Sequence, residues 1–214
     1  MVFQIQELYI DPEFQKQAQE FFNSEGQIQL KDFFTPGSKE FLEFTSTILS
    51  KKCARECFKE EYNPLSHKYK ILDQKHTLAQ SREHEFFKSK TFQEIIEQTI
   101  GFDLQLVSSE ISLFSHKSYE LIHDEKITNS LLIDVYFFIT HDEYNEFDGG
   151  HKVYTTFDEE IFYLTPEHNA LTCVFRDEEL RQYTKYINVN AKHKKYIQIK
   201  NTYEVVEGIT QDLI

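Results

Sequence analysis

Residues 123–125 hold the spacing in this sequence that most directly suggests chemistry. His123 is followed two positions later by Glu125, with Asp124 between them, at the end of an alternating apolar run. A histidine and a carboxylate at this spacing can supply two ligands of a facial iron site, which a second histidine completes. The chemistry therefore depends on a third ligand and on the elements that would position it.

The region after Gly101 has the sequence pattern of an antiparallel β barrel. It contains short runs of β-branched and aromatic residues separated by turn or charged residues. The runs are 102–114, 118–123, 131–139, 151–157, 161–166, 170–175, 182–188 and 194–200. Eight runs in about a hundred residues predict a sandwich or barrel. The stretch Asp148-Gly149-Gly150 predicts a hairpin turn.

The first hundred residues are predicted to be mainly helical. Asp11 as N-cap and Pro12 at the first helical position predict the start of one helix, and Gly26 predicts its end. Further helices are expected over 37–52 and 81–101, because apolar residues recur there at helical spacing. These elements would support the barrel from outside.

We therefore predict one α+β domain over residues 1–214. About 1–101 would form the mainly helical support, and about 102–206 a double-stranded β-helix (jelly-roll) barrel braced by these N-terminal helices. The sequence contains 6 Gly and 4 Pro, with no flexible linker and no repeat, which favours one large domain over two.

The charge balance of the chain indicates which partners it can attract. The chain has 36 acidic and 23 basic residues and a formal net charge of -13. Such a field repels phosphate, so nucleic acid is a poor ligand, and it attracts a basic protein. We predict the partner contact at the acidic residues that precede the hairpin turn: Asp142, Glu143, Glu146 and Asp148.

Cysteine content and hydropathy indicate the compartment. Three cysteines do not make a disulfide framework. Cys53 and Cys57 fall four residues apart on one face of a predicted helix end, and we expect reduced thiols there. No apolar run is long enough to span a bilayer, and Met1 does not open a secretory signal. We expect an intracellular protein, cytoplasmic or nuclear, that does not bind membranes.

The order of landmarks in the second half resembles that of oxygenases that use iron and 2-oxoglutarate. The resemblance rests on "YELIHDE", "LLIDVYFFIT", "FDGGHKVY" and "YLTPEHNALTCVF", which run from residue 119 to residue 175. It implies a barrel that holds iron through two histidines and a carboxylate. It also implies a basic residue, usually arginine, that binds the far carboxylate of 2-oxoglutarate through a bidentate fork.

The chain departs from this pattern at two positions. No histidine occurs between His168 and His193, and Tyr183 stands where the resemblance places the second histidine ligand. Lys195 stands at the 2-oxoglutarate clamp and lacks the bidentate fork of arginine. The resemblance thus implies vestigial metal-site positions at His123, Glu125 and Tyr183, a vestigial clamp at Lys195, and no bound metal or cofactor.

A narrower resemblance covers about residues 10–205. The "EHNAL" turn, the following "RDEE" at 176–179 and "KYIN" at 185–188 are similar to the C-terminal half of the ribosomal prolyl hydroxylase family. In that family the C-terminal half is an oxygenase-like domain without the iron triad. The resemblance implies a non-catalytic domain for protein–protein interaction, linked to translation and the ribosome or to the regulation of a prolyl hydroxylase. The implied partner is a basic or ribosome-associated protein.

Two alternatives remain open on the sequence. The first is an active prolyl hydroxylase that uses Fe(II) and 2-oxoglutarate, with His123, Glu125 and an unorthodox third ligand. The second is a structural subunit of a larger assembly. The content of bound metal distinguishes the first alternative from the other functions.

Overall fold

The computed structural model describes residues 3–50, 54–63, 68–78, 82–122, 131–156, 159–177 and 179–207. Its helices are α1 (Pro12–Glu25), α2 (Lys39–Ser50), α3 (Arg82–Phe87) and α4 (Lys90–Ile100), with 3-10 turns η1 (Glu7–Ile10) and η2 (Val189–Ala191). Its strands are β1 (Gln27–Leu30), β2 (Ala54–Asn63), β3 (Lys68–Leu78), β4 (Asp103–Ser115), β5 (Tyr119–Glu120), β6 (Leu132–Thr140), β7 (Lys152–Thr155), β8 (Glu160–Leu164), β9 (Ala170–Arg176), β10 (Arg181–Thr184) and β11 (Lys195–Glu207).

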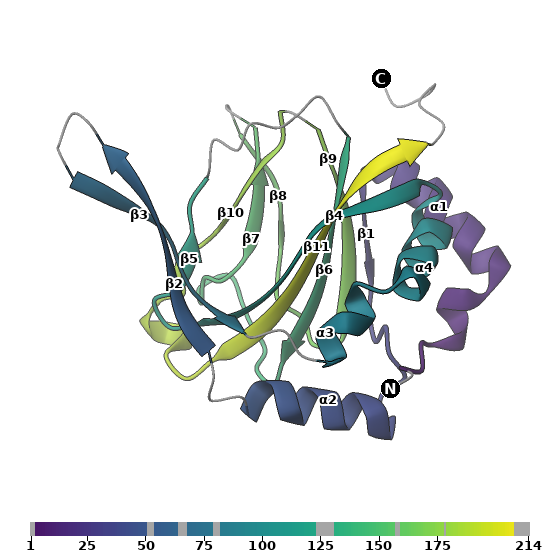
Figure 1. Cartoon of the computed structure of the whole chain (residues 1–214), viewed down its shortest axis with the longest axis horizontal. Helices are drawn as coiled ribbons and strands as arrows, with labels where there is room; N and C mark the ends of the chain where they lie inside the picture. The colour runs from purple at the N-terminus through teal and green to yellow at the C-terminus, as the bar shows by residue number, and fades with distance from the viewer. Residues whose placement is uncertain are drawn as a thin grey trace.

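The strands form one continuous hydrogen-bonded path that folds into two facing sheets. Along the path the order is β1-β9-β6-β11-β4-β3-β5-β10-β7-β8, and β2 pairs with β3 outside the path. The larger sheet contains β1, β9, β6, β11 and β4, and the smaller sheet contains β5, β10, β7 and β8 (Figure 1). All strand pairs in this path are antiparallel, as in the predicted double-stranded β-helix.

Strand β6 shows why the sheet has two buried faces. Successive side chains of a strand point to opposite faces. Ile133, Val135 and Phe137 therefore pack against the helical layer, whereas Tyr136 and Phe138 pack in the interior of the barrel. The strand is buried along nearly its whole length, so its sequence appears as a continuous apolar run rather than an alternating one.

The helices cover the outer face of the larger sheet, as predicted (Figure 1). Phenylalanine rings fill this interface: Phe137 of β6 lies 5.1 Å from Phe34 and 5.2 Å from Phe87, between ring centroids. The predicted ends of α1 are confirmed. Asp11 Oδ1 accepts hydrogen bonds from the backbone N–H of Glu13 and Phe14, each 3.0 Å long, and Gly26 adopts a left-handed φ of 68°.

The first hundred residues differ from the prediction between 54 and 78, where β2 and β3 form a hairpin instead of a helix end and a loop. Cys57 accordingly lies in a strand, and Cys53 lies outside the described residues. The region is rich in charged residues, which hides the period of two on which a strand prediction depends. Strand β3 also joins the two sheets, because it pairs with both β4 and β5.

The helices carry no membrane-spanning signal. Over the described ranges, none of them combines the length and the apolar character needed to cross a bilayer.

The hairpin predicted at Asp148-Gly149-Gly150 is wrong, because the flanking strands β6 and β7 pair with other strands and not with each other. The turn between them nevertheless contains a glycine that the fold requires. Gly149 has a φ of 74°, and a Cβ atom built there would lie 1.9 Å from the backbone oxygen of Tyr186. Gly37 has a similar φ of 78°, but a Cβ atom built there would meet nothing within 4 Å. The two glycines therefore separate the cost of a left-handed backbone from the cost of a steric clash.

We expect Gly149→Ala to destabilise the fold far more than Gly37→Ala. A left-handed alanine costs about 1–2 kcal/mol, and only the substitution at 149 adds a clash with the backbone. Urea denaturation followed by circular dichroism measures both losses. Equal losses in the free energy of unfolding would show that the close approach of Gly149 to Tyr186 is not required.

Candidate functional site

A buried carboxylate lies inside the barrel, at the end where β6 begins. The Asp134 side chain is fully buried. Arg176 of β9 donates to it from Nε at 2.9 Å and from Nη2 at 3.5 Å. From β11, Thr202 donates its hydroxyl at 2.8 Å, and the Lys200 ammonium lies 3.4 Å from Asp134 Oδ1. Three neighbouring strands are thus joined through one charge.

The hydrogen bonds continue from Asp134 to the smaller sheet. The Tyr154 hydroxyl on β7 lies 3.3 Å from Asp134 Oδ2 and 2.8 Å from the Tyr136 hydroxyl. Tyr136 donates in turn to Gln182 Oε1 on β10. We call Asp134, Arg176, Lys200, Thr202, Tyr154, Tyr136 and Gln182 the interior network. It spans the barrel from one sheet to the other.

A second ion pair lies beside the interior network. Lys152 of β7 pairs with the carboxylate of Glu120 on β5. Thr184 of β10 donates its hydroxyl to the same carboxylate at 2.5 Å. The ammonium groups of Lys152 and Lys200 lie 5.8 Å and 5.7 Å from the centroid of the Tyr136 ring. The buried charged groups of the barrel interior are therefore paired with one another, whereas Gln198 Oε1, on the same face of β11 as Lys200, has no partner among the described residues.

The electrostatics of the interior network keep Asp134 ionised. Burial disfavours its charge, but Lys200 and Arg176 outweigh burial and hold the pKa of the carboxyl below its ordinary value. Burial, and then the negative charge of Asp134, raise the pKa of the Tyr136 and Tyr154 phenols well above the usual range. At neutral pH both tyrosines are therefore neutral hydrogen-bond donors.

Of the predicted metal-site and clamp residues, the structure describes Tyr183 and Lys195, and neither side chain lies in this interior. His123 and Glu125 lie outside the described residues. Tyr183 lies between two β10 residues that point into the barrel, Gln182 and Thr184, so its own side chain projects from the opposite face. Lys195 is exposed at the start of β11.

The inward-facing cation of β11 is Lys200, which the sequence prediction missed. Ile197 and Ile199 pack against the helices, so alternate residues such as Lys200 and Thr202 face the interior. This period of two is visible in the sequence. Within the described ranges, no group of three His, Cys, Asp or Glu side chains could hold a metal ion.

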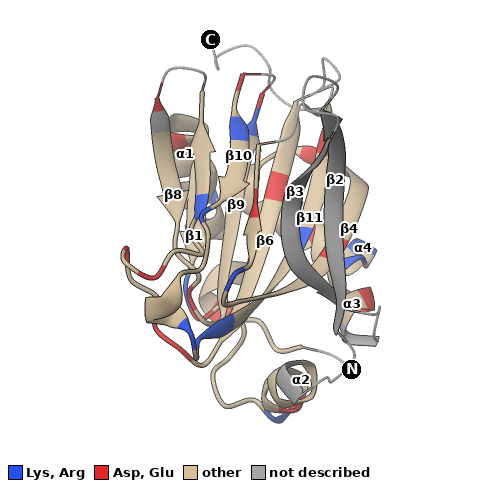
Figure 2. Ribbon diagram, turned by 90° about the vertical axis from the view of Figure 1, so that its left-hand side faces the viewer, with Lys and Arg blue, Asp and Glu red and all other residues tan. Residues whose placement is uncertain are grey.

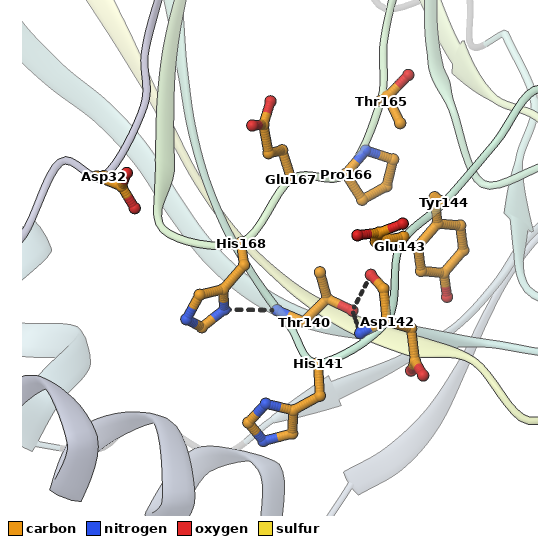
Figure 3. A pocket seen from close by; sticks show the side chains of 10 residues that line it. All are labelled: Asp32, Thr140, His141, Asp142, Glu143, Tyr144, Thr165, Pro166, Glu167 and His168. Carbon is orange, nitrogen blue, oxygen red and sulfur yellow. Dashed lines mark hydrogen bonds between the residues drawn. The ribbon is translucent and has the colours of Figure 1, made fainter. Parts of the chain in front are cut away.

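A pocket of about 640 Å³ opens at the opposite end of the barrel, where β6 finishes (Figure 3). Its walls are the turn after β6, the turn between β8 and β9, and the turn after β1. The lining residues are Asp32, Thr140, His141, Asp142, Glu143, Tyr144, Thr165, Pro166, Glu167 and His168. Asp134 and Thr140 are six residues apart on one strand, which separates the Asp134 carboxylate from this wall of the pocket by about 20 Å.

The predicted acidic contact lies at the pocket end, but only part of it can reach a partner. Asp148 is buried, and its carboxylate accepts from Lys194 Nζ at 2.7 Å and from the Asn145 N–H at 2.8 Å. Its prediction as a contact residue is therefore wrong. Asp142 is partly buried and accepts from the Lys195 N–H at 3.2 Å.

The remaining two members of the predicted contact, Glu143 and Glu146, are exposed. Asp142 and Asp148 are less exposed than Glu143 and Glu146 because the basic stretch 191–195 folds against the acidic turn. Lys194 Nζ also donates to the backbone oxygen of Glu143 at 2.6 Å. Acidic and basic residues accordingly lie side by side on the turns at this end (Figure 2).

Histidines stabilise the turns around the pocket. His151 is buried and bonds the Asn145 backbone oxygen through Nε2 at 2.9 Å, and its Nδ1 lies 3.2 Å from the Thr165 hydroxyl. Burial lowers its pKa. His168 Nδ1 accepts from the Thr140 N–H at 3.3 Å (Figure 3).

The facing sheets and their strand order define the double-stranded β-helix of iron and 2-oxoglutarate oxygenases. A prolyl hydroxylase from Trichoplax adhaerens, solved with a hypoxia inducible factor peptide, is similar with a TM-score of 0.61 and 11% identity, over 93% of this chain and 92% of that chain. An oxygenase of the 2OG-Fe(II) family from Burkholderia pseudomallei is similar with a TM-score of 0.60 and 10% identity, over 91% of this chain and 92% of that chain. A prolyl-4-hydroxylase from Pseudomonas putida is similar with a TM-score of 0.58 and 9% identity, over 89% of this chain and 98% of that chain. At these identities the likeness shows the fold alone.

The family is shown by sequence. The profile of the family described as "Oxoglutarate and iron-dependent oxygenase degradation C-term" matches residues 2–212, so the chain belongs to this family. Prolyl 3-hydroxylase OGFOD1 of Xenopus laevis is 31% identical over 100 residues, which are 42% of this chain and 20% of that protein. The chain therefore matches about a fifth of the length of this relative. The predicted relation to the prolyl hydroxylases is confirmed.

We expect Asp134→Ala to lower the free energy of unfolding by about 3–5 kcal/mol, because it leaves the buried Arg176 without its counter-ion. The exposed Asp103→Ala is the matched control and should cost less than about 0.5 kcal/mol. Adding Arg176→Met to Asp134→Ala should recover part of the loss. Urea denaturation gives all three values. A loss at 134 no larger than that at 103 would contradict a structural role for the interior network.

We expect stability to fall as pH decreases from 7.5 to 5.5. The histidines of the unfolded chain take up protons near their ordinary pKa of about 6.5, whereas burial keeps His151 neutral to lower pH. The unfolded state then binds more protons, so protonation favours unfolding. Thermal melts at both pH values measure the fall, and His151→Gln should make it smaller. If the pH dependence of stability is the same in this variant, the buried His151 does not contribute to it.

Proposed function

We propose that this domain binds a protein partner and performs no iron or 2-oxoglutarate chemistry of its own. The observation that carries the proposal is the interior network. In an oxygenase of this fold the barrel interior must admit metal and co-substrate, whereas here Asp134, Arg176 and Lys200 join its strands in a buried ion-pair cluster. Breaking such a cluster to admit a ligand would expose uncompensated buried charges.

The chemistry of the partner follows from the charge of the chain. The net charge of -13 favours a basic protein. The exposed carboxylates of Glu143 and Glu146 supply a contact at the pocket end of the barrel. The likeness to a prolyl 3-hydroxylase supports a role in regulating such an enzyme. A partner from the ribosome and translation follows only from the resemblance in sequence to the ribosomal prolyl hydroxylase family.

We expect no stoichiometric iron in the purified chain. The test is anaerobic titration with Fe(II) and 2-oxoglutarate, followed by metal analysis and visible spectroscopy. No charge-transfer band should develop, because Tyr183 and Lys195 do not face the interior. Close to one iron per chain, lost on His123→Ala, would overturn the proposal and establish the alternative of an active hydroxylase.

We expect association with the basic partner to be fast at low salt and slower as salt rises, because charges near an interface mainly act on the association rate. The partner is first retained from extract on the immobilised chain, identified by mass spectrometry and purified. Association rates are then measured at several salt concentrations. Glu143→Lys with Glu146→Lys should slow association.

The matched control is Glu13→Lys with Glu20→Lys, on the exposed side of α1, which makes the same change in net charge. If both double variants slow association equally, the effect is one of net charge and the contact lies elsewhere. If no basic protein is retained by the unmodified chain, the proposed function is wrong.

A further inference from the structure

The outer face of the smaller sheet points away from the helices. Among the described residues, the core between the helices and the barrel contains residues of β1, β4, β6, β9 and β11, and none of β5, β7, β8 or β10. The helices accordingly pack on the larger sheet (Figure 1). The free face of an antiparallel sheet is normally solvated, so polar side chains are expected on the outer face of the smaller sheet.

Tyrosines and a valine occupy this outer face instead. Gln182 and Thr184 bond groups inside the barrel, so Tyr183 between them points outward. Tyr183 pairs with Val153 of β7, and Val153 pairs with Tyr163 of β8. Val153 is fully buried in the centre of this row, whereas Tyr163 is 55% exposed. Residues that pair across strands project from the same face, so one row of apolar side chains crosses three strands.

Two more large apolar side chains extend the row. Ile161 of β8 is 47% exposed. Tyr186, just after β10, is 49% exposed, and its ring centroid lies 6.2 Å from that of Tyr119 on β5. We call Tyr119, Val153, Ile161, Tyr163, Tyr183 and Tyr186 the outer tyrosine face. Exposed apolar groups gathered on one face mark protein interaction sites, and tyrosine is enriched where such sites bind most strongly.

The charge of the outer tyrosine face differs from that of the whole chain. Arg181 and Lys185 lie two residues on either side of Tyr183, so both project from the same face as its ring. The described residues at the outward positions of β5, β7 and β10 include no carboxylate. Glu160 of β8 and Arg181 pair with the same residue of β7, so the basic character is strongest at the Lys185 end. In a chain of net charge -13, this face favours an acidic partner.

The geometry of the face favours a helix as the occupant. β8 is the last strand of the path, but its pairing with β7 has a register shift after Tyr154, and a bulged edge disfavours the addition of a strand. Two copies packed face to face would bring like charges together. Tyr183 and Tyr163 are two strand spacings apart, about 10 Å, which is close to the diameter of a helix. The larger sheet is covered by helices in the same way.

We propose that the outer tyrosine face binds an acidic amphipathic helix of a protein partner. The apolar stripe of the helix packs between Tyr183 and Tyr163, over the buried Val153, and acidic residues along its margin pair with the basic end of the face at Lys185. The phenol hydroxyls stay at the rim, where they reach polar groups of the helix. This surface is distinct from Glu143 and Glu146, so the inference does not rest on the proposed function.

The test uses three capped helical peptides of equal length as probes. The first has a leucine stripe at helical spacing and glutamates on its margins, the second has lysines in place of the glutamates, and the third has alanines in place of the leucines. Each is titrated into the isotope-labelled whole chain while backbone amide shifts are recorded. We expect the first peptide to shift amides of 152–155, 161–164 and 181–186, and the other two to bind there at least tenfold more weakly. The net charge of the chain favours the lysine peptide, so only the local charge of the face can produce this order.

Tyr163→Ser should weaken the acidic peptide about tenfold, because it removes an exposed anchor of the face. The matched control is Phe21→Ser, which removes an equally exposed ring from α1 and should leave binding unchanged. Arg181→Gln with Lys185→Gln should also weaken binding, whereas Lys16→Gln with Lys39→Gln makes the same change in net charge elsewhere and should not. Amide spectra of the variants verify the fold. No binding of the acidic peptide, shifts outside the face, or stronger binding of the lysine peptide to it would overturn the proposal.

Two further measurements separate this face from other interfaces. Sedimentation velocity of the chain alone should show no self-association that Tyr163→Ser removes, since such a result would assign the face to a second copy and overturn the acidic helix. Tyr163→Ser should also leave the association with the basic partner unchanged. Loss of that association would make the face part of the basic partner's interface and would equally overturn the proposal.

Discussion

The carboxylate of Asp134 is the charge on which the barrel interior depends. It is fully buried and is stabilised only because Arg176, Lys200 and Thr202 approach it from β9 and β11. A charge in such a place is tolerated when it is paired and hydrogen-bonded, and it is very costly otherwise. The register of three strands is thus coupled to one side chain, since a slip by a single residue would turn Asp134 or Lys200 toward the helices.

This coupling shows how charged and polar side chains hold together the interior of a double-stranded β-helix barrel. A barrel of this size must fill its interior with side chains or with a ligand. Here Tyr136, Tyr154 and Phe138 supply volume, and the interior network pairs the buried charges. Recognition of other molecules by such a fold depends on the sites that its ends and surfaces carry.

Much of the barrel could be predicted from sequence because its signals are local. Each of the eight runs after Gly101 overlaps one of the strands β4 to β11, although β11 continues seven residues beyond its run. Asp11, Gly26 and Gly101 mark helix ends as their conformational preferences require. The hairpin of β2 and β3 could not be predicted in this way, because its many charged residues obscure the alternation. The residues of the interior network were harder to predict than the strands. Asp134 was visible as a lone charge in an apolar run, but its charged partners, Arg176 and Lys200, come from strands more than forty residues away.

Lys195 and Tyr183 illustrate the same limit. Both are predicted from spacing along the chain, and spacing does not settle which face of a strand a residue occupies. Successive residues of β11 face opposite sides of the sheet. Because the apolar Ile197 and Ile199 face the helices, this alternation predicts that Lys200, rather than Lys195, faces the interior. The pocket at the other end depends on three turns that are distant in sequence, so only their folded arrangement brings its carboxylates together.

Strand β1 has a consequence for dissecting this protein into fragments. Its residues Gln27–Leu30 pair with Leu171–Val174 of β9 and so cover what would otherwise be an open edge of the larger sheet. A fragment that began at the barrel, near residue 102, would lose this strand together with the helices that bury Ile133, Val135 and Phe137. Unprotected edges and apolar faces promote self-association. The N-terminal segment is therefore an integral part of the sheet, and the barrel is not an independently excisable unit.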